Sequence, residues 1–570
     1  MKSYLIKIFF TSFYFGLNIS NAQTFEWAKS FGGVSNDIGR SITLDTLGNI
    51  YISGYFESTV DFDPGPGTFY LTSAGGWDAY IQKMDASGNF IWAKSFGSTG
   101  IYDIVMHHAL DVDGNIYSTG KFDGTVDFDP GVGSFNLTSA GVRDIFISKL
   151  DANGNFIWAS SFGGPSNDDG FSIAVDEFNH IYTSGLFKGT VDFDPTAGIY
   201  NLSSAGDIDV FILKMDLDGN FLWAKSFGGT SYDYMHSLAV DESGNVYTTG
   251  YFDGTSDFDP GSGTFNITSV GEEDVFIQKM DAYGNFVWAK SFGGVLKDRG
   301  NSIAIDYLGN IFIKGSFEGT VDFDCGTGIH NITAIGSFDT FVEKLDTNGN
   351  FLWAKTFAKF FGSTIEEGSN IGLVIDALGN TYITDYFEGT VDFDPGNGIF
   401  NLTSSGNTDI YIHKMDNNGN FLWATALGGS SYDTGYQITL DDSSNIFTTG
   451  FFDGTADFFP GIGNFNLVSS GGIDAYILKL SQPITTINEF LVINSLVAYP
   501  IPTSDIVNIS FGDVVNHASF TVRDVLGNVI STQENYKLSV AKLELIGAKG
   551  LYFIDINADG IHRTLKVVKN

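Results

Sequence analysis

Asn285-Phe-Val-Trp-Ala-Lys-Ser-Phe-Gly-Gly294 is one copy of a segment that recurs along the chain. Each copy carries a tryptophan at the same place, and successive tryptophans are 65, 66, 65, 65, 65 and 70 residues apart. These tryptophans are Trp27, Trp92, Trp158, Trp223, Trp288, Trp353 and Trp423. A period of this length is typical of repeat architectures in which each unit is one supersecondary structure. The repeat therefore decides the fold class.

Four stretches of the repeat that ends with this segment carry a strand pattern. Ser237–Asp241 is short and apolar, and Asn245–Phe252 is rich in β-branched and aromatic residues. Val275–Met280 and Phe286–Phe292 alternate between apolar and polar positions. Alternation and β-branched residues indicate strands, and no stretch of the repeat has a helical period. The sequence predicts an all-β protein with four strands per repeat.

The turns between these strands support antiparallel pairing. Asp241-Glu-Ser-Gly-Asn245 joins the first two strands, and Asp281-Ala-Tyr-Gly-Asn285 joins the last two. An aspartate can cap such a turn, and glycine supplies the positive φ that other residues resist. The motif drifts in two turns, which end Asn179-His180 and Ser444-Asn445. A four-stranded meander repeated seven times predicts a seven-bladed β-propeller over residues 23–481, about 65 residues per repeat. A β-helix is the alternative, although its repeats are shorter and lack paired hairpins.

The two ends of the repeat region complement each other. Phe25–Phe31 reads as a fourth strand with no earlier strands before it, and Ala475–Leu480 reads as a third strand with no fourth strand after it. We therefore expect residues 25–31 to pair with residues 475–480 as the outer strand of the seventh blade. Such closure removes the exposed edges that invite aggregation.

These repeat motifs resemble the SBBP-type β-propeller repeats of exported bacterial proteins. The resemblance covers roughly residues 25–480. It implies the propeller fold but says little about activity, because propellers serve as enzymes, lectins and adhesins alike.

Composition and the N-terminus bear on partners and compartment. The 570 residues include 67 acidic and 29 basic ones, for a net charge of −38, which argues against nucleic acid or an anionic membrane as a partner. The single cysteine, Cys325, excludes an intramolecular disulfide. Residues 1–22 combine Lys2 and Lys7 with an apolar run and a small-residue cleavage site, which indicates a secretory signal peptide. No later segment is long and apolar enough for a transmembrane helix.

The more elaborate end of the predicted propeller is the candidate ligand face. An insertion of about twenty residues separates the second and third strands of each repeat, beyond what a propeller blade needs. The links between repeats add further acids, namely Asp37, Asp103, Asp168, Asp233, Asp298 and Asp433. Because loops carry function more often than scaffolds do, we expect a glycan or protein ligand on this acidic loop face.

An Asp-Phe-Asp motif recurs within these insertions. The pairs are Asp61 and Asp63, Asp127 and Asp129, Asp192 and Asp194, Asp257 and Asp259, Asp322 and Asp324, and Asp392 and Asp394. In the last repeat Phe459 replaces the second aspartate. Side chains at i and i+2 of an extended segment point the same way, so each pair is a candidate Ca²⁺ site. The simpler interpretation makes the motif a turn with phenylalanine as its anchor, and it is favoured because no EF-hand spacing is present.

Catalysis requires residues that are not repeated in every blade. The single-copy candidates are His107-His108, Glu272-Glu273, Glu366-Glu367 and the off-register Trp77. Their spacing forms no nucleophile–base pair, metal-ligand run or phosphate-binding glycine loop. We therefore assign no catalytic residue and no certain cofactor, and we expect a non-enzymatic protein.

The C-terminal segment differs from the repeats. Residues 482–495 break the repeat and read as a linker to residues 496–570. Within the latter we expect strands at Val507–Phe511, Ser519–Val522, Gly550–Ile556 and Thr564–Val568. Short strands joined by turns predict a small antiparallel sandwich.

This segment resembles the type A sorting domain of the type IX secretion system of Bacteroidota. The residues that carry the resemblance are Tyr499, Pro500, Pro502, Gly527, Gly550, Leu551, Tyr552 and Lys569. One departure is Ile501, where the family usually has asparagine. The resemblance implies that the type IX machinery is a partner, and that the protein is secreted or attached at the outer-membrane cell surface after removal of the tail.

Taken together, the sequence favours a secreted or surface propeller that binds a glycan or a protein. An exported hydrolase acting on polysaccharide or peptide and a structural surface component are the alternatives. Near-uniform repeats favour binding or a scaffolding role, because repetition offers multivalency whereas chemistry needs one unique site.

Overall fold

The computed structural model describes residues 23–360, 372–461, 463–482, 497–499, 506–524, 528–546, 549–558 and 561–569. The predicted signal peptide, Glu366, Glu367 and nearly all of the predicted linker lie outside these residues. The chain divides into two compact units, Met1–Pro483 and Ile484–Asn570. None of the described residues belongs to a helix, so the all-β prediction is confirmed.

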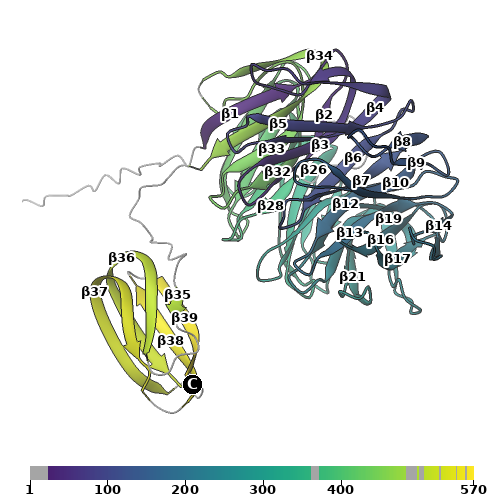
Figure 1. Ribbon diagram of the computed structural model, residues 1–570. Helices are drawn as coiled ribbons and strands as arrows, with labels where there is room; N and C mark the ends of the chain where they lie inside the picture. Colours follow the sequence, from purple (N-terminus) through teal and green to yellow (C-terminus); the bar gives the residue numbers. More distant parts are fainter. Residues whose placement is uncertain are drawn as a thin grey trace, which may run out of the picture. The chain divides into compact units, whose positions relative to one another are not determined.

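The first unit is built from four-stranded antiparallel groups, one for each sequence repeat (Figure 1). The first strands of the groups are β2 (Ile38–Leu44), β6 (Ile104–Leu110), β12 (Asp169–Val175), β18 (Asp233–Val240), β22 (Asp298–Ile305), β28 (Leu373–Ile375) and β32 (Thr434–Leu440). The second strands are β3 (Ile50–Asp61), β7 (Ile116–Phe122), β13 (His180–Phe187), β19 (Val246–Asp257), β23 (Ile311–Phe317), β29 (Thr381–Asp392) and β33 (Ile446–Asp457). The third strands are β4 (Tyr70–Met84), β10 (Asp144–Leu150), β16 (Asp209–Asp216), β20 (Asn266–Met280), β26 (Phe338–Leu345), β30 (Asn401–Met415) and β34 (Asn466–Ser481). The fourth strands are β5 (Phe90–Phe96), β11 (Phe156–Phe162), β17 (Phe221–Gly229), β21 (Phe286–Phe292), β27 (Phe351–Phe360) and β31 (Phe421–Gly429).

The group of β32, β33 and β34 takes its fourth strand from the other end of the chain. That strand is β1 (Thr24–Phe31), which pairs antiparallel with β34 so that Phe31 lies opposite Ala475 and Phe25 opposite Leu480. The expected pairing of residues 25–31 with residues 475–480 is therefore present. Phe31 is buried in one cluster with Ala475 and with Ile42 of the first group, so β1 packs between the last and the first repeat.

Tight turns join the strands as the Asp-x-x-Gly-Asn motif predicts. In the first turn, Asp45 Oδ1 accepts hydrogen bonds from the backbone N–H groups of Leu47 and Asn49, and Gly48 has a φ of 78°. The two drifted turns keep this backbone without glycine, since Asn179 has a φ of 66° and Ser444 a φ of 58°.

The recurring tryptophan contacts the next repeat. The Trp27 ring packs on Gly88, so that a Cβ at Gly88 would lie 3.0 Å from the ring. Trp158 packs on Gly219 in the same way and donates a hydrogen bond of 3.2 Å to the Leu217 carbonyl. The recurring tryptophan therefore joins each group to the following one by covering its tight turn.

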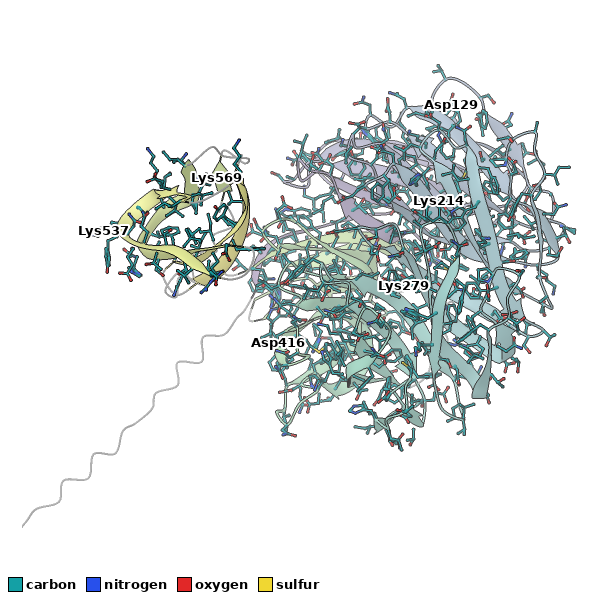
Figure 2. All side chains as sticks on the ribbon, turned by 90° about the horizontal axis from the view of Figure 1, so that it is seen from below. Asp129, Lys214, Lys279, Asp416, Lys537 and Lys569 are labelled. Atoms are coloured by element: carbon teal, nitrogen blue, oxygen red, sulfur yellow. The ribbon has the colours of Figure 1, made fainter. Side chains whose placement is uncertain are left out.

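The insertion between the second and third strands is a β-ribbon rather than an irregular loop. In the repeat of β19 and β20 the two strands extend into it, and Asp257 lies opposite Asn266. The strands extend in the same way in the repeats of β3 and β4, β29 and β30, and β33 and β34. In the other three repeats the ribbon is a separate pair of short strands: β8 (Thr125–Asp127) with β9 (Asn136–Thr138), β14 (Thr190–Asp192) with β15 (Asn201–Ser203), and β24 (Thr320–Asp322) with β25 (Asn331–Thr333). Figure 2 shows Asp129, just beyond β8, at the periphery of the unit.

The second unit contains one antiparallel sheet. Its strands are β35 (Val497–Tyr499), β36 (Ile506–Arg523), β37 (Val529–Glu544), β38 (Gly550–Ala558) and β39 (Ile561–Lys569). β36 spans both strands expected at 507–511 and 519–522, and the expected strands in β38 and β39 are present. β37 was not expected, because its polar residues conceal the strand pattern, although it pairs with β36 along most of its length.

Candidate functional site

The Asp-Phe-Asp motif stabilises the end of each ribbon. Asp257 Oδ1 accepts backbone hydrogen bonds from Asp259, at 3.1 Å, and from Phe265 across the ribbon, at 2.7 Å. Asp259 Oδ1 accepts a hydrogen bond of 2.8 Å from the Gly261 backbone. Phe258 between them is fully buried. Each carboxylate is thus engaged with its own loop, and phenylalanine is the anchor.

The other five pairs repeat this arrangement. Their first aspartates, Asp61, Asp127, Asp192, Asp322 and Asp392, accept from the backbone at i+2 and i+8. Their second aspartates, Asp63, Asp129, Asp194, Asp324 and Asp394, accept from the backbone at i+2. Within the described parts of the chain, no group of three or more His, Cys, Asp or Glu side chains is placed to hold a metal ion. This geometry favours the turn-forming interpretation, and calcium binding by the pairs stays a prediction.

The double variant Asp257→Asn, Asp259→Asn separates the two interpretations. Asparagine keeps the acceptor Oδ1, so turn formation predicts a loss of less than about 1 kcal/mol in the free energy of unfolding and no change in the response to Ca²⁺. If the pairs bind calcium, the free energy of unfolding should rise gradually with the Ca²⁺ concentration. The variant should then lose the part of this rise that comes from one site. Calorimetric titration of both proteins with Ca²⁺ after treatment with chelator measures this difference. Heat and a rise in Tm in the wild type that the variant lacks would reject the turn-only interpretation.

The acids in the links between repeats are not surface groups. We expected them to contribute to an acidic loop face, but Asp37, Asp103, Asp168, Asp233, Asp298 and Asp433 are at most 1% exposed. Burial raises the pKa of Asp37 to about 7. These carboxyls cannot contact a ligand in solution, so the loop face is less acidic than the sequence suggests.

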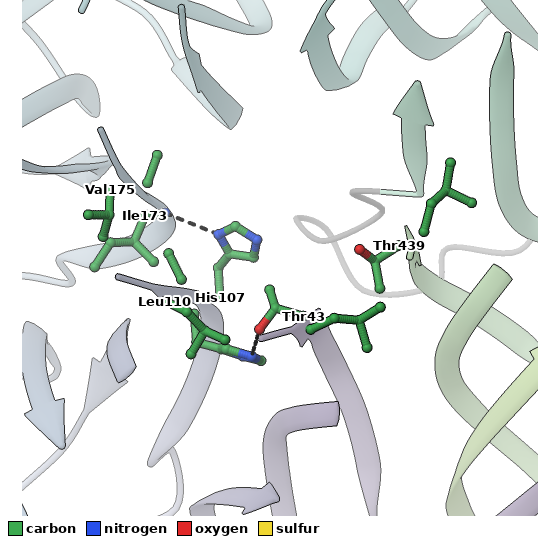
Figure 3. A pocket seen from close by; sticks show the side chains of 11 residues that line it. Thr43, His107, Leu110, Ile173, Val175 and Thr439 are labelled. Atoms are coloured by element: carbon green, nitrogen blue, oxygen red, sulfur yellow. Dashed lines mark hydrogen bonds between the residues drawn. The ribbon is translucent and has the colours of Figure 1, made fainter. Parts of the chain in front are cut away.

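A cavity of about 390 Å³ lies where the ends of four first strands, β2, β6, β12 and β32, come together (Figure 3). It is at the end of these strands that leads into the tight turns, opposite to the predicted loop face. Its lining residues are Thr43, Leu44, His107, His108, Ala109, Leu110, Ile173, Ala174, Val175, Thr439 and Leu440. No charged side chain lines this cavity, although the protein as a whole is strongly acidic.

Both histidines of the cavity are held by hydrogen bonds. His107 Nδ1 accepts from the Ile173 backbone at 3.2 Å, and His108 contacts the hydroxyls of Thr43 and Ser53, both at 2.7 Å. Burial lowers the pKa of His107 to about 4 and that of His108 to about 3. Because His108 and Ser53 are fully buried and His108 binds a proton weakly, their contact is structural rather than a nucleophile–base pair.

An aromatic and cationic cluster lies at the other end of the first strands. We call Arg40, Tyr55, Trp77, Tyr102 and Arg143 the aromatic–cation cluster. The rings of Trp77 and Tyr55 stack with centroids 4.5 Å apart, and Trp77 meets Tyr102 edge-on at 5.3 Å. The guanidinium of Arg40 lies 5.5 Å from the Tyr55 ring, and that of Arg143 lies 5.8 Å from the Tyr102 ring. Such contacts fix a partly exposed, single-copy surface on a repetitive frame.

Trp77 stands out in the sequence as the off-register tryptophan, whereas the arginines beside it follow no motif. The repeat region, residues 23–481, contains only three arginines, Arg40, Arg143 and Arg299. Each lies over a tyrosine ring, in the case of Arg299 that of Tyr251 at 4.8 Å. The rarity of arginine in the repeats was the sequence signal that could have identified these residues.

Of the single-copy glutamates, Glu273 forms ion pairs, whereas its neighbour Glu272 is exposed. Glu273 Oε2 accepts a hydrogen bond of 2.5 Å from Arg299 Nε, and its other oxygen lies 3.6 Å from Lys297 Nζ. Glu273 therefore positions Arg299 against Tyr251.

Glu343 in β26 is a buried acid in a place where other repeats have a neutral residue. Gln82 and Gln278 occupy the corresponding position, and each donates a hydrogen bond of 2.6 Å to a backbone carbonyl of its ribbon. Glu343 is fully buried, and neither carboxyl oxygen has a hydrogen-bond partner among the described residues. Burial, with Asp324 nearby, raises the pKa of Glu343 well above its ordinary value of 4.5.

We expect Glu343→Gln to stabilise the protein, and the gain to grow with pH. The pKa of Glu343 is higher in the folded protein than in the unfolded chain. The free energy of unfolding is therefore highest below pH 4.5, and it falls as the pH rises toward the folded-state pKa. The loss is about 1.4 kcal/mol per pH unit for one proton. Denaturant unfolding at pH 4 and pH 8 measures the effect. The reverse change Gln278→Glu is the matched control and should introduce the same pH dependence; identical pH profiles for all three proteins would contradict the expectation.

The sorting-motif residues occupy the second unit. Gly550 begins β38 and lies opposite Lys569 of β39. Tyr552 is 5% exposed, and Lys569 Nζ donates a hydrogen bond of 2.6 Å to the Leu545 carbonyl. Tyr499 ends β35, and Leu551 follows Gly550 in β38. Pro500, Pro502 and Gly527 lie outside the described residues. The described motif residues of β38 and β39 therefore gather at one end of this strand pair, where Gly550 lies opposite Lys569.

Comparison with protein families identifies both units. The model of the secretion system C-terminal sorting domain matches residues 497–570, and the beta-propeller repeat model, SBBP, matches residues 26–55 and 222–259. The chain is an SBBP-type propeller-repeat protein with a type IX sorting domain. The sorting domain directs this SBBP-repeat protein through type IX secretion to the cell surface or the extracellular space. No helix in the described parts of the chain has the length and apolarity needed to cross a membrane.

More distant relatives add little about activity. The chain is 24% identical to an uncharacterized WD repeat-containing protein, L264, of Acanthamoeba polyphaga mimivirus, over 76% of this chain and 36% of that protein. It is 25% identical to the regulatory protein FlaEY of Caulobacter vibrioides, over 49% of this chain and 29% of that protein. The chain thus spans about a third of the length of these curated relatives.

Two solved structures align with long stretches of this chain, but their TM-scores are low. One, described as a putative gluconolactonase, has a TM-score of 0.23 and 11% identity, covering 59% of this chain and 84% of its own. The other, a protein of unknown function from Bacteroides thetaiotaomicron, has a TM-score of 0.27 and 11% identity, covering 80% and 98%. Scores this low carry no argument about fold or function.

Proposed function

We propose that the repeat region is a closed seven-bladed propeller and that it binds an extracellular ligand without catalysing a reaction. The first strands support the ring, because β2, β6, β12, β18, β22, β28 and β32 contact one another in this order and β32 contacts β2. The insertion of β1 between the last and first repeats supports closure. Each four-stranded group is then one blade around a common axis.

In the second unit, we propose that the long sheet folds on itself as a sandwich. The pairing of β36 with β37 shifts register between Ser510 and Val515, where a strand can bend. Residues from both sides of this shift, among them Val507 and Phe520, share one buried cluster with Tyr552 and Val567.

The ligand is a glycan or a protein, and the aromatic–cation cluster is where it binds. The observation that carries this proposal is the cluster around Trp77 and Arg143, two residue types that each occur once at their position in the repeat, with Tyr102 between them. Tyr102 is 37% exposed and Trp77 is partly exposed, so both rings can contact a ligand. Aromatic and arginine side chains are enriched where proteins recognise other molecules, because they provide large contact areas and several donors.

A binding screen tests this proposal. Residues 23–481 are screened against glycan arrays and extracted surface proteins, with and without chelator, and the Trp77→Ala variant is measured on every hit. We expect Trp77→Ala to weaken binding at least about tenfold, equivalent to 1.4 kcal/mol.

Tyr283→Ala is the matched control. Tyr283 is 79% exposed on a tight turn at the opposite end of the strands, so its loss should not change binding. Binding that survives Trp77→Ala but is lost in Tyr283→Ala would place the ligand at the other end. Turnover of a bound glycan or peptide would favour the exported hydrolase, and no binding at all would favour a structural component.

A further inference from the structure

Two buried aspartates meet at the junctions between consecutive groups. One comes from the link to the next first strand, and the other begins or lies within the third strand of the preceding group. The pairs are Asp37 with Asp474, Asp168 with Asp144, Asp233 with Asp209, Asp298 with Asp274, and Asp433 with Asp409. Asp103 and Asp78 occupy the same sequence positions at a sixth junction, where they contact Ser98 and Gly97. All twelve side chains are at most 4% exposed.

The link aspartate has the hydrogen bonds of an ionised carboxylate. Asp233 Oδ2 accepts from the Gly229 backbone at 2.6 Å, and Oδ1 accepts from the Ser256 hydroxyl at 2.5 Å. In another junction, Asp433 accepts backbone hydrogen bonds at both oxygens, from Gly429 at 2.7 Å and from Asp453 at 3.2 Å. A carboxylate that accepts at both oxygens is stabilised in its charged form.

The third-strand aspartate is different. Asp209 Oδ2 accepts from the Ala205 backbone at 2.8 Å, whereas Oδ1 is buried and has no hydrogen-bond partner among the described residues. The same oxygen is unpartnered in Asp78, Asp144, Asp274, Asp409 and Asp474. A buried oxygen without a partner costs about 1–3 kcal/mol if nothing satisfies it, so its recurrence has to be explained by the surroundings of the carboxyl.

The unpartnered oxygen lies beside the link carboxylate. A Cβ built on Gly228 would lie 2.7 Å from Asp209 Oδ1 and 2.9 Å from Asp233 Oδ2. A Cβ built on Gly428 would lie 2.9 Å from Asp409 Oδ1 and 2.8 Å from Asp433 Oδ2. The two carboxyls thus converge over one glycine at both of these junctions, and a side chain at Gly228 or Gly428 would clash with them.

We propose that each junction is a proton-binding site, in which the third-strand aspartate keeps a proton in weakly acidic solution and shares it with the link carboxylate. The proton sits on the unpartnered Oδ1 and is directed at the link aspartate, directly or through one water. Two buried like charges cannot both ionise at low cost, and one proton leaves the pair with a single charge. Six junctions then tie neighbouring groups together by acid–carboxylate contacts.

Burial and the neighbouring acids raise the pKa values of both aspartates in a pair. Burial raises the pKa of Asp209 to about 6, and burial, with Asp209 and Asp253 nearby, raises that of Asp233 to about 7. At the other junction, Asp453 and Asp409 both face Asp433 and raise its pKa. No cation is among the groups that shift these pKa values, so nothing in these surroundings replaces the proton.

Stability should therefore fall as the pH rises. Because the folded pKa values exceed the ordinary value of 3.8, the stabilisation is complete below that pH and is lost as the pH passes through about 6 to 7. Each retained proton changes the unfolding equilibrium constant tenfold per pH unit in this window. The junctions would loosen in alkaline surroundings and tighten in acid.

The Asp209→Asn variant of the full chain tests the proposal. The amide of asparagine donates permanently where the carboxyl proton is proposed, so the variant should match the wild type at pH 4 and be more stable at pH 8. We expect the ratio of the two unfolding constants to change tenfold per pH unit between about pH 4 and 6. Infrared spectra at pH 5 should show a protonated-carboxyl C=O band in the wild type that is weaker in the variant.

Two further variants keep the outcome interpretable. Asp233→Asn replaces the acceptor and should destabilise the protein at every pH, while Asp409→Asn repeats the test at a second junction if Asp209→Asn fails to fold. Equal pH dependence in wild type and Asp209→Asn, with no carboxyl band, would overturn the proposal. A rise in stability with Ca²⁺ at pH 8 that Asp209→Asn abolishes would also overturn it, in favour of a metal ion between the two carboxyls.

Discussion

Deletion of residues 23–31 should cost more than about 5 kcal/mol of unfolding free energy and leave the protein prone to association. The deletion removes β1, and with it the buried Phe31 and its ring contacts with Phe62, at 5.1 Å, and Tyr80, at 5.5 Å. Loss of one such phenylalanine alone costs about 3–5 kcal/mol. The deletion also leaves β34 as an unpaired edge, which invites pairing with another chain. Thermal unfolding and light scattering measure both effects.

The control distinguishes ring closure from loss of core volume. Phe31→Ala and Phe96→Ala remove the same residue from equivalent fourth strands, and both are expected to destabilise the protein by a similar amount without exposing an edge. A peptide of residues 23–31 added to the deleted protein should restore much of its stability. An unchanged Tm after the deletion would contradict the closed seven-bladed ring.

Removal of residues 496–570 should abolish delivery to the cell surface while leaving the repeats folded. The sorting domain is the element that type IX secretion recognises. The repeats form a compact unit of their own up to Pro483, so their stability should not depend on the tail. Fractionation of cells that express the truncated chain, followed by proteolysis of the periplasmic fraction, measures location and folding together.

A fusion of residues 497–570 to an unrelated periplasmic protein provides the complementary measurement. We expect the fusion to reach the surface. Normal surface amounts of the truncated chain would show that another part of the protein carries the export signal.

The four-stranded repeat could be predicted because several independent features of the sequence indicate it. The Trp27 period, the Asp-x-x-Gly-Asn turns and the incomplete strands at both ends each indicate the same arrangement. The pairing of Phe31 with Ala475 followed from counting strands alone. These are local signals, repeated many times, and each repeat confirms the others.

The candidate sites were less predictable, because they depend on burial and on contacts between distant repeats. Asp37 and Glu273 read as surface acids, yet Asp37 is buried and Glu273 is ion-paired. The stacking of Trp77 on Tyr55 could not be seen, since neither residue type nor spacing reveals which rings meet. β37 was missed because one of its faces is polar.

The strand β1 also constrains the order of events during export. Its partner β34 lies some 450 residues away, yet the entropic cost of closing a loop grows only with the logarithm of its length, about 0.6 kcal/mol per doubling. Pairing of β1 with β34 therefore has a small entropic cost once the repeats between them have folded. It cannot occur before the last repeat is present. In a chain that crosses a membrane with its N-terminus first, β1 thus waits without its partner until the final repeat emerges, and the proposed ring can close only on the far side.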